Sequence, residues 1–183
     1  MVRSRLLAIA LAGALALTSA CGSDEDEPLT DSQARWVDAF CGGLLPGKRA
    51  GQELTAQDPA DPAAVKAAYL ELVTANAAAL ADAEKKLTEL GPPSDELEDV
   101  HERLTKYVGE SARSYAAAEA PVKALEPNAQ FWENAEKALA GTSQVSRPED
   151  LRATFDALEK SPKYSAAMAK SKPCSELQSG SRN

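Results

Sequence analysis

The chain contains three cysteines, and their positions decide which covalent chemistry the sequence allows. Cys21 directly follows the small residues 18–20 and an apolar stretch, a context in which a cysteine thiol receives a lipid. Cys41 and Cys174 lie near the two ends of the remaining chain, and neither has a CxxC partner, which argues against a redox motif. Lipidation of one thiol and a disulfide between the other two are therefore the chemistries to consider.

Residues 1–20 have the composition of a secretory signal peptide. Arg3 and Arg5 form a cationic start, and Leu6–Leu17 is an uncharged apolar stretch. This stretch is too short for a hydrocarbon core, which needs about 20 residues. We therefore expect a leader that is cleaved before Cys21 rather than a permanent membrane span.

Two interpretations of the cleavage site are open. Residues 18–20 could form an ordinary small-residue site that frees a secreted protein, or they could belong to a lipobox that ends in Cys21. Leu17 fits a lipobox, whereas Thr18 stands where that pattern prefers leucine. Lipidation removes an odd thiol, which is a liability in an oxidising compartment. We therefore expect acyl chains such as palmitate on Cys21, which hold the protein on the extracytoplasmic face of the cell membrane.

With Cys21 lipidated, Cys41 and Cys174 remain as one pair, and we expect a disulfide between them. Such a bond would tie the two ends of the fold together. The chain-entropy estimate for so long a loop is about 5 kcal/mol, which is large beside a net stability of about 5–15 kcal/mol. Two free buried thiols are the alternative.

His101 is the only histidine, and Glu98 three residues earlier gives a Glu-x-x-His motif on a predicted helix. Helical di-iron sites need two such motifs and further glutamates. We therefore expect no metal here, and we interpret the acids around His101 as a solvated helix start that complements the helix dipole. No Gly-x-Ser-x-Gly, Ser-x-x-Lys or glycine-rich phosphate motif occurs. We expect neither an enzyme nor a cofactor.

The mature chain is acidic, because removing Arg3 and Arg5 takes the formal charge from −8 to −10. Nucleic-acid affinity comes from neutralised phosphates, so we expect no nucleic-acid partner. An anionic membrane should not attract the domain either, which leaves the lipid as its anchor. Residues 21–29 include four adjacent acids and predict a disordered tether, with an acidic metal- or partner-binding patch as the alternative.

Residues 30–178 are rich in Ala, Leu, Glu and Lys, and their apolar spacing predicts an all-α domain. Thr30 and Gln33 have capping-box spacing at the start of a first helix. Leu45-Pro46-Gly47 should interrupt that helix. Residues 179–183 are polar and predict a disordered tail.

The second and third helices are predicted from their ends. Asp61 caps a helix with proline at its first position, and Gly91-Pro92-Pro93 ends it. Ser94 or Asp95 caps the next helix, which should kink or stop at Pro121. Two long antiparallel helices joined by a tight turn favour a four-helix-type bundle.

The C-terminal third predicts additional short helices. One starts at Phe131 and ends at Gly141, and a second follows Ser146, whose spacing to Glu149 is that of a capping box. The last opens at Ser161-Pro162 and ends before Cys174.

Asn76 and Ser111 are polar members of apolar stripes on the second and third helices. They could mark a ligand cavity between helices; alternatively, Asn76 fixes the helix register and Ser111 eases close packing. The aromatic members of the stripes are Trp36, Tyr69, Tyr115 and Trp132. We expect them in the core, with the lining of an apolar pocket as the alternative.

Three segments resemble a group of small Ala-rich secreted proteins and lipoproteins of actinobacteria. Trp36–Leu44 resembles their opening, Leu90–Pro93 their mid-chain turn and Pro173–Leu177 their closing segment. The resemblance implies a helical, exported domain tied by a disulfide. It implies no activity and no functional residue.

These features together predict a membrane-tethered, non-enzymatic helical domain that binds another envelope protein through its surface. The alternative is a binder of a small apolar or lipidic ligand in a cavity between helices. An enzyme is the third interpretation.

Overall fold

The computed structural model describes residues 28–142 and 148–179, and all structural statements below concern these residues. They form seven α-helices and one 3-10 helix, with no strand among them. The predicted all-α fold is therefore confirmed. The predicted signal peptide, Cys21, Ser146 and residues 180–183 lie outside the described residues.

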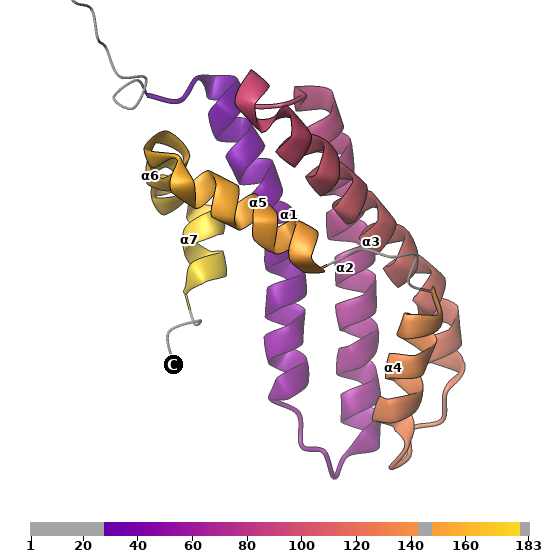
Figure 1. Ribbon diagram of the computed structural model, residues 1–183. Helices are drawn as coiled ribbons and strands as arrows, with labels where there is room; N and C mark the ends of the chain where they lie inside the picture. The colour runs from indigo at the N-terminus through magenta and orange to yellow at the C-terminus, as the bar shows by residue number, and fades with distance from the viewer. Residues whose placement is uncertain (1–27, 143–147, 180–183) are drawn as a thin grey trace, which may run out of the picture.

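Three long helices run side by side and make up most of the fold (Figure 1). They are α1 (Asp31–Thr55), α2 (Pro62–Leu90) and α3 (Glu98–Ala124), which follows the 3-10 helix η1 (Asp95–Leu97). Helix α2 lies between the other two and packs against both. Each connection reverses the chain direction, so neighbouring long helices are antiparallel.

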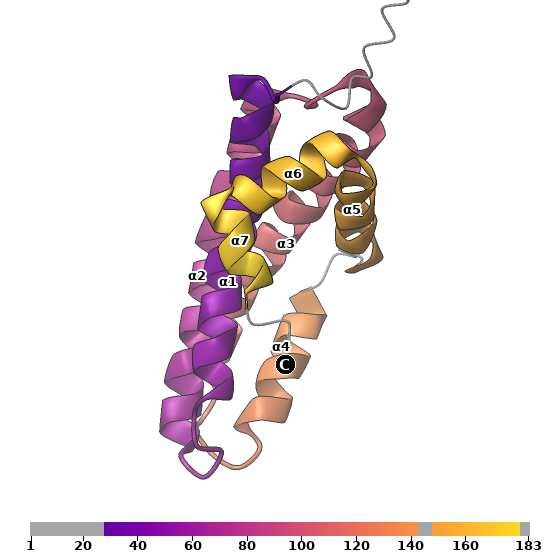
Figure 2. The same cartoon turned by 90° about the vertical axis from the view of Figure 1, so that its left-hand side faces the viewer.

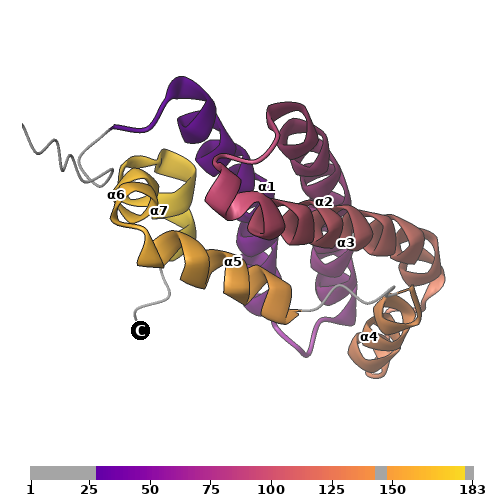
Figure 3. The ribbon, with the colours of Figure 1, turned by 45° about the horizontal axis from the view of Figure 1, so that its top comes forward.

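Four shorter helices complete the bundle. They are α4 (Phe131–Thr142), α5 (Pro148–Lys160), α6 (Pro162–Lys170) and α7 (Lys172–Gln178). Helix α4 packs against one end of α3 and α5 against the other, while α6 and α7 pack against α1 (Figures 2 and 3). The fourth position of the bundle is thus shared by α4 and α5.

Two of the predicted helix starts are confirmed in atomic detail. The Thr30 hydroxyl accepts the Gln33 backbone N–H, and the Gln33 side chain accepts the Thr30 backbone N–H. The Asp61 carboxylate accepts the backbone N–H groups of Ala63 and Ala64, each at 3.1 Å. Because these N–H groups have no partner inside the helix, such caps stabilise each helix by about 1 kcal/mol. The predicted Ser94 or Asp95 cap of the third helix is wrong, because Ser94 precedes η1 without a side-chain cap bond and α3 begins after Leu97, also without one.

The predicted interruption at Leu45-Pro46-Gly47 is wrong, because α1 runs through Pro46 to Thr55. A proline inside a helix costs about 3 kcal/mol, since it removes one backbone hydrogen bond and crowds the preceding turn. Core packing beyond the proline offsets this cost: Ala50 and Leu54 are both buried. Tertiary packing therefore overrides the local preference.

The predictions for two later helices also need correction. Helix α3 does not stop at Pro121 but continues to Ala124, with Val122 fully buried. The chain also forms one more helix than predicted, because Cys174 lies inside α7 rather than after the last helix. The Lys48 ammonium on α1 donates to the carbonyls of Glu176 and Leu177, which caps the C-terminal end of α7.

A disulfide joins Cys41 on α1 to Cys174 on α7, as predicted. The two residues are 133 positions apart in the sequence, and their Cα atoms are 4.9 Å apart. Both side chains are buried. The bond therefore fastens the last helix of the domain to the first.

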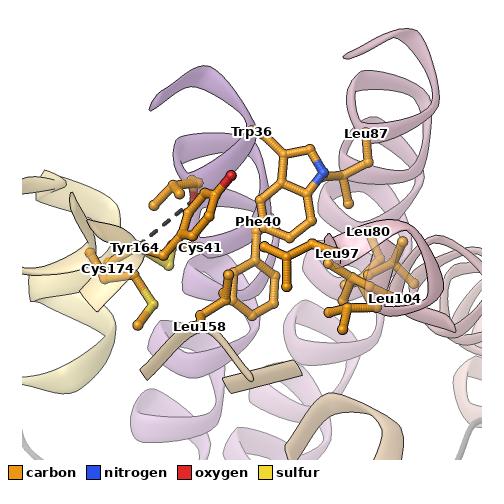
Figure 4. Close-up of a cluster of buried hydrophobic side chains, with 14 of the residues drawn as sticks. Trp36, Phe40, Cys41, Leu80, Leu87, Leu97, Leu104, Leu158, Tyr164 and Cys174 are labelled. Atoms are coloured by element: carbon orange, nitrogen blue, oxygen red, sulfur yellow. Dashed lines mark hydrogen bonds between the residues drawn. A yellow bond between two sulfur atoms is a disulfide. The ribbon is translucent and has the colours of Figure 1, made fainter. Parts of the chain in front are cut away.

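The apolar core has two parts. The first surrounds Trp36 and Phe40 beneath α5–α7, where Leu87 and Leu104 are also fully buried (Figure 4). The second lies beneath α4 at the opposite end of the bundle. Its buried members are Leu54, Val65, Tyr69, Val73, Ala118, Val122, Phe131 and Ala135.

Close contact between α1 and α2 depends on glycine, and two adjacent glycines allow a matched test. A Cβ atom at Gly43 would lie 2.4 Å from the Ala83 Cβ, whereas one at Gly42 would meet nothing within 4 Å. We expect Gly43→Ala to lower the free energy of unfolding by about 1–3 kcal/mol through overpacking. Gly42→Ala should raise it by about 0.5–1 kcal/mol, because alanine favours helix. Urea denaturation of both variants checks the opposite signs; equal effects would contradict the close packing.

Candidate functional site

His101, half of the predicted Glu-x-x-His motif, is a buried member of the core. Its Nδ1 accepts a hydrogen bond of 3.0 Å from the Trp36 Nε1–H, which places the ring proton on Nε2. Burial lowers the pKa of His101 below its ordinary 6.5, against the charge of Glu102, which raises it. The histidine is therefore neutral and structural. The acids Glu98, Asp99 and Glu102 around it are exposed, as predicted for a solvated helix start.

The environment of His101 predicts a pH dependence of stability. Because its pKa is lower in the folded than in the unfolded chain, stability is complete above pH 6.5. It falls as the pH drops from 6.5 towards the folded-state pKa, since the unfolded chain binds the proton first. Urea denaturation at pH 7.5 and 5.5 should show a larger loss in the parent than in His101→Gln. Equal losses would show that this histidine does not contribute.

Glu98 does not join His101 in a ligand set. Glu98 is exposed at the first position of α3, while the His101 Nδ1 already accepts the bond from Trp36. Within residues 28–142 and 148–179, no three His, Cys, Asp or Glu side chains are arranged to hold a metal ion.

The two polar stripe residues lie between packed helices. Asn76 donates to the Leu72 carbonyl at 2.8 Å, and a Cβ atom at Gly47 would lie 2.1 Å from its Oδ1. Asn76 therefore sits directly against the backbone of α1. Ser111 is buried on α3 and hydrogen-bonds Tyr107, whose pKa is raised by burial and lowered in part by this bond. Neither polar residue lines the groove described next.

An apolar groove of about 360 Å³ lies at the end of the bundle where α1 meets α2 and α3 meets α4. We call this end the tip; it is opposite the start of α1 (Figure 1). Trp132 on the groove is 44% exposed and is the one large apolar side chain classed as exposed in the described part of the chain. The groove is lined by Leu54, Thr55, Gln57, Pro59, Pro62, Val65, Asn128, Ala129, Phe131 and Trp132.

Local hydrogen bonds and ring contacts hold the groove in shape. The Asp58 carboxylate accepts the Ala60 N–H, which closes the turn between α1 and α2. The Asn128 side chain accepts the Gln130 N–H just before α4. Tyr69 meets Trp132 edge-on, with ring centroids 5.9 Å apart. These contacts fix the positions of the residues around the groove.

The outward position of Trp132 corrects the prediction that it belongs to the core. Phe131 and Trp132 are consecutive on α4, and consecutive helical residues point about 100° apart. Phe131 lies on the buried face with Ala135, and its ring centroid is 6.0 Å from that of Tyr69. Trp132 therefore points outward. The sequence alone did not settle this, because adjacent residues of a helix can both be buried, as Trp36 and Val37 are on α1.

A larger groove of about 630 Å³ lies at the opposite end of the bundle and is lined mostly by polar residues. Two of these residues form hydrogen bonds that hold helices together. Gln33 and Tyr164 both line it, and both donate to the Pro93 carbonyl, at 2.9 and 3.1 Å. These bonds tie α1 and α6 to the turn between α2 and η1. We therefore take the tip groove as the candidate functional site.

None of the described helices combines the length and the apolarity that crossing a membrane requires. Comparison with known proteins identifies no family model that matches this chain. It also finds no matching curated protein and no matching solved structure.

Proposed function

We propose that this protein is a bacterial lipoprotein, cleaved and lipidated at Cys21, whose helical domain binds an envelope protein through the tip groove. The domain works by binding, without catalysis and without a cofactor. Its resemblance to small Ala-rich lipoproteins of actinobacteria is part of this proposal. The single observation that carries the binding role is the exposed Trp132 on an otherwise apolar groove.

The position of the groove suits a protein anchored through its N-terminus. Helix α1 contains 25 residues, which corresponds to about 37 Å at 1.5 Å per residue. The groove lies at the C-terminal end of α1, whereas Leu29 directly precedes the N-terminal cap of this helix. An anchor on Cys21 would therefore leave the tip furthest from the lipid and open to a partner.

Trp132 has the chemistry of an interface anchor. Tryptophan is enriched at the energetic centres of protein interfaces, where a large ring is desolvated against apolar neighbours. Here the ring lies beside Phe131 and Val65, and the amides of Gln57 and Asn128 offer hydrogen bonds at the same groove. Apolar surface with a few polar groups is the composition of a recognition site.

Site-specific photo-crosslinking in intact cells tests this function. We expect p-benzoylphenylalanine at position 57 to form a defined crosslinked product with another protein. Trp132→Ala should reduce that product at least about tenfold, because anchor residues contribute about 2 kcal/mol or more. The same crosslinker at Arg35, exposed at the opposite end, is the matched control and should not form the product. A product that is unchanged by Trp132→Ala would contradict the proposal.

A small apolar ligand in the same groove is the second candidate, because about 360 Å³ lies within the range of small-molecule sites. Native mass measurement of the protein extracted from membranes separates the two. A stoichiometric adduct that is lost in Trp132→Ala, together with no protein crosslink, would favour the ligand.

A further inference from the structure

All the charged side chains in the two chain segments that form the tip groove are acidic. All lining residues of the groove belong to residues 50–65, from the end of α1 to the start of α2, or to residues 124–136, from the end of α3 to the first half of α4. Neither segment contains a lysine or an arginine. The acids in these two segments are Glu53, Asp58, Asp61, Glu126, Glu133 and Glu136.

Three lysines flank the two segments: Lys66, Lys123 and Lys137. The Lys66 ammonium donates to the carbonyls of Lys123 and Leu125, at 2.9 and 2.5 Å, and so caps the end of α3. The Lys137 ammonium pairs with Glu133 at 2.6 Å. Among the described residues, the six acids of the two segments therefore outnumber the three flanking lysines, and only Glu133 among these acids has an ion pair.

Acidic charge also reaches Tyr69, which meets Trp132 edge-on with ring centroids 5.9 Å apart. Burial and, to a lesser extent, the charge of Glu136 together raise the pKa of Tyr69 to about 12. An apolar groove and a negative potential therefore coincide at one place.

We propose that the groove takes a cationic segment of the partner, in which an aliphatic or aromatic side chain is flanked by lysine or arginine. The apolar side chain lies against Trp132 and Phe131, and the flanking cations face the acids of the two segments. Oppositely charged surfaces speed association and suppress wrong partners. This inference rests on the proposed function and adds the chemistry of the partner to it.

The same charge argues against two other occupants. An anionic lipid surface would meet the carboxylates of the tip, and like charges at an interface are unfavourable. A second copy docked tip to tip would bring two sets of six such acids together. A cationic protein segment is the occupant that satisfies both the apolar groove and its charge.

The test uses the full chain in cells, with the crosslinker at position 57 as before. One variant neutralises three exposed tip acids that have no ion pair, as Glu53→Gln, Glu126→Gln and Glu136→Gln. Its matched control neutralises three exposed acids outside the tip, as Asp99→Asn, Glu102→Gln and Glu159→Gln. We expect the tip variant to lower the crosslink yield about five- to tenfold and the control to leave it unchanged. Sequencing of the crosslinked partner peptide should show a net positive segment.

The other outcomes would overturn this inference, and they show whether the proposed function fails with it. A yield that falls with Trp132→Ala but not with the tip variant would overturn the cationic partner and leave the proposed function standing. An acidic partner peptide, or a product of twice the protein's own mass, would also overturn it. A yield that Trp132→Ala leaves unchanged would remove the proposed function and this inference together.

Discussion

Loss of the disulfide is expected to lower the free energy of unfolding by about 4–5 kcal/mol. Cys41 and Cys174 are 133 positions apart, so the bond removes much of the chain entropy of the unfolded state. Helix α7 spans only Lys172–Gln178, and helices this short are not stable alone in water. Without the bond, α7 keeps only the packing of Leu177 against the core and polar contacts such as the Lys48 cap.

Urea denaturation of Cys41→Ala with Cys174→Ala measures this effect, with Cys21→Ser in both parent and variant to exclude thiol exchange. Alanine is preferred to serine because both positions are buried in apolar surroundings. Reduction of the parent should produce the same shift. A loss below about 1 kcal/mol would show that the bond adds little to a fold already held by its core.

Substitution by alanine should lower the free energy of unfolding far more at Trp36 than at Trp132. Trp36 is fully buried at the centre of the first core cluster, and Trp36→Ala should cost about 3–5 kcal/mol through the cavity it leaves. The substitution also removes the hydrogen bond to the His101 Nδ1. Trp132→Ala should cost no more than about 1–2 kcal/mol, because 44% of this residue is already exposed to solvent.

Denaturation of both variants under one set of conditions checks this contrast, and Trp36→Phe isolates the loss of the indole N–H. Similar costs for Trp36→Ala and Trp132→Ala would contradict the assignment of Trp132 to the surface. The comparison also supports the crosslinking experiments, since it shows that Trp132→Ala removes a binding group without unfolding the domain.

Local signals in the sequence predicted two helix starts and the disulfide. Thr30 with Gln33 and Asp61 with Pro62 are short-range arrangements, in which the capping atoms lie within one turn of each other. The parity of the cysteines predicted the pair Cys41 and Cys174 for a chemical reason that does not need the fold. These features can be predicted from a single sequence, because capping partners lie within one helical turn of each other and only two cysteines remain to form a pair.

Features that depend on packing between distant segments were not predicted. The hydrogen bond between Trp36 and His101 joins positions 65 apart, and no local pattern connects them. Pro46 sits inside a helix because Ala50 and Leu54 beyond it are buried, which the local sequence does not reveal. The tip groove also combines residues from two connections that meet only in the folded chain.

The central claim is that Cys21 carries lipid and that the domain works from the membrane surface. Growth of cells with labelled palmitate, followed by tryptic digestion of the protein, tests it directly. The account predicts label on the peptide Cys21–Arg35, which contains no earlier tryptic site, in protein recovered from the membrane fraction. An unlabelled peptide from mature protein that accumulates in the medium would contradict it.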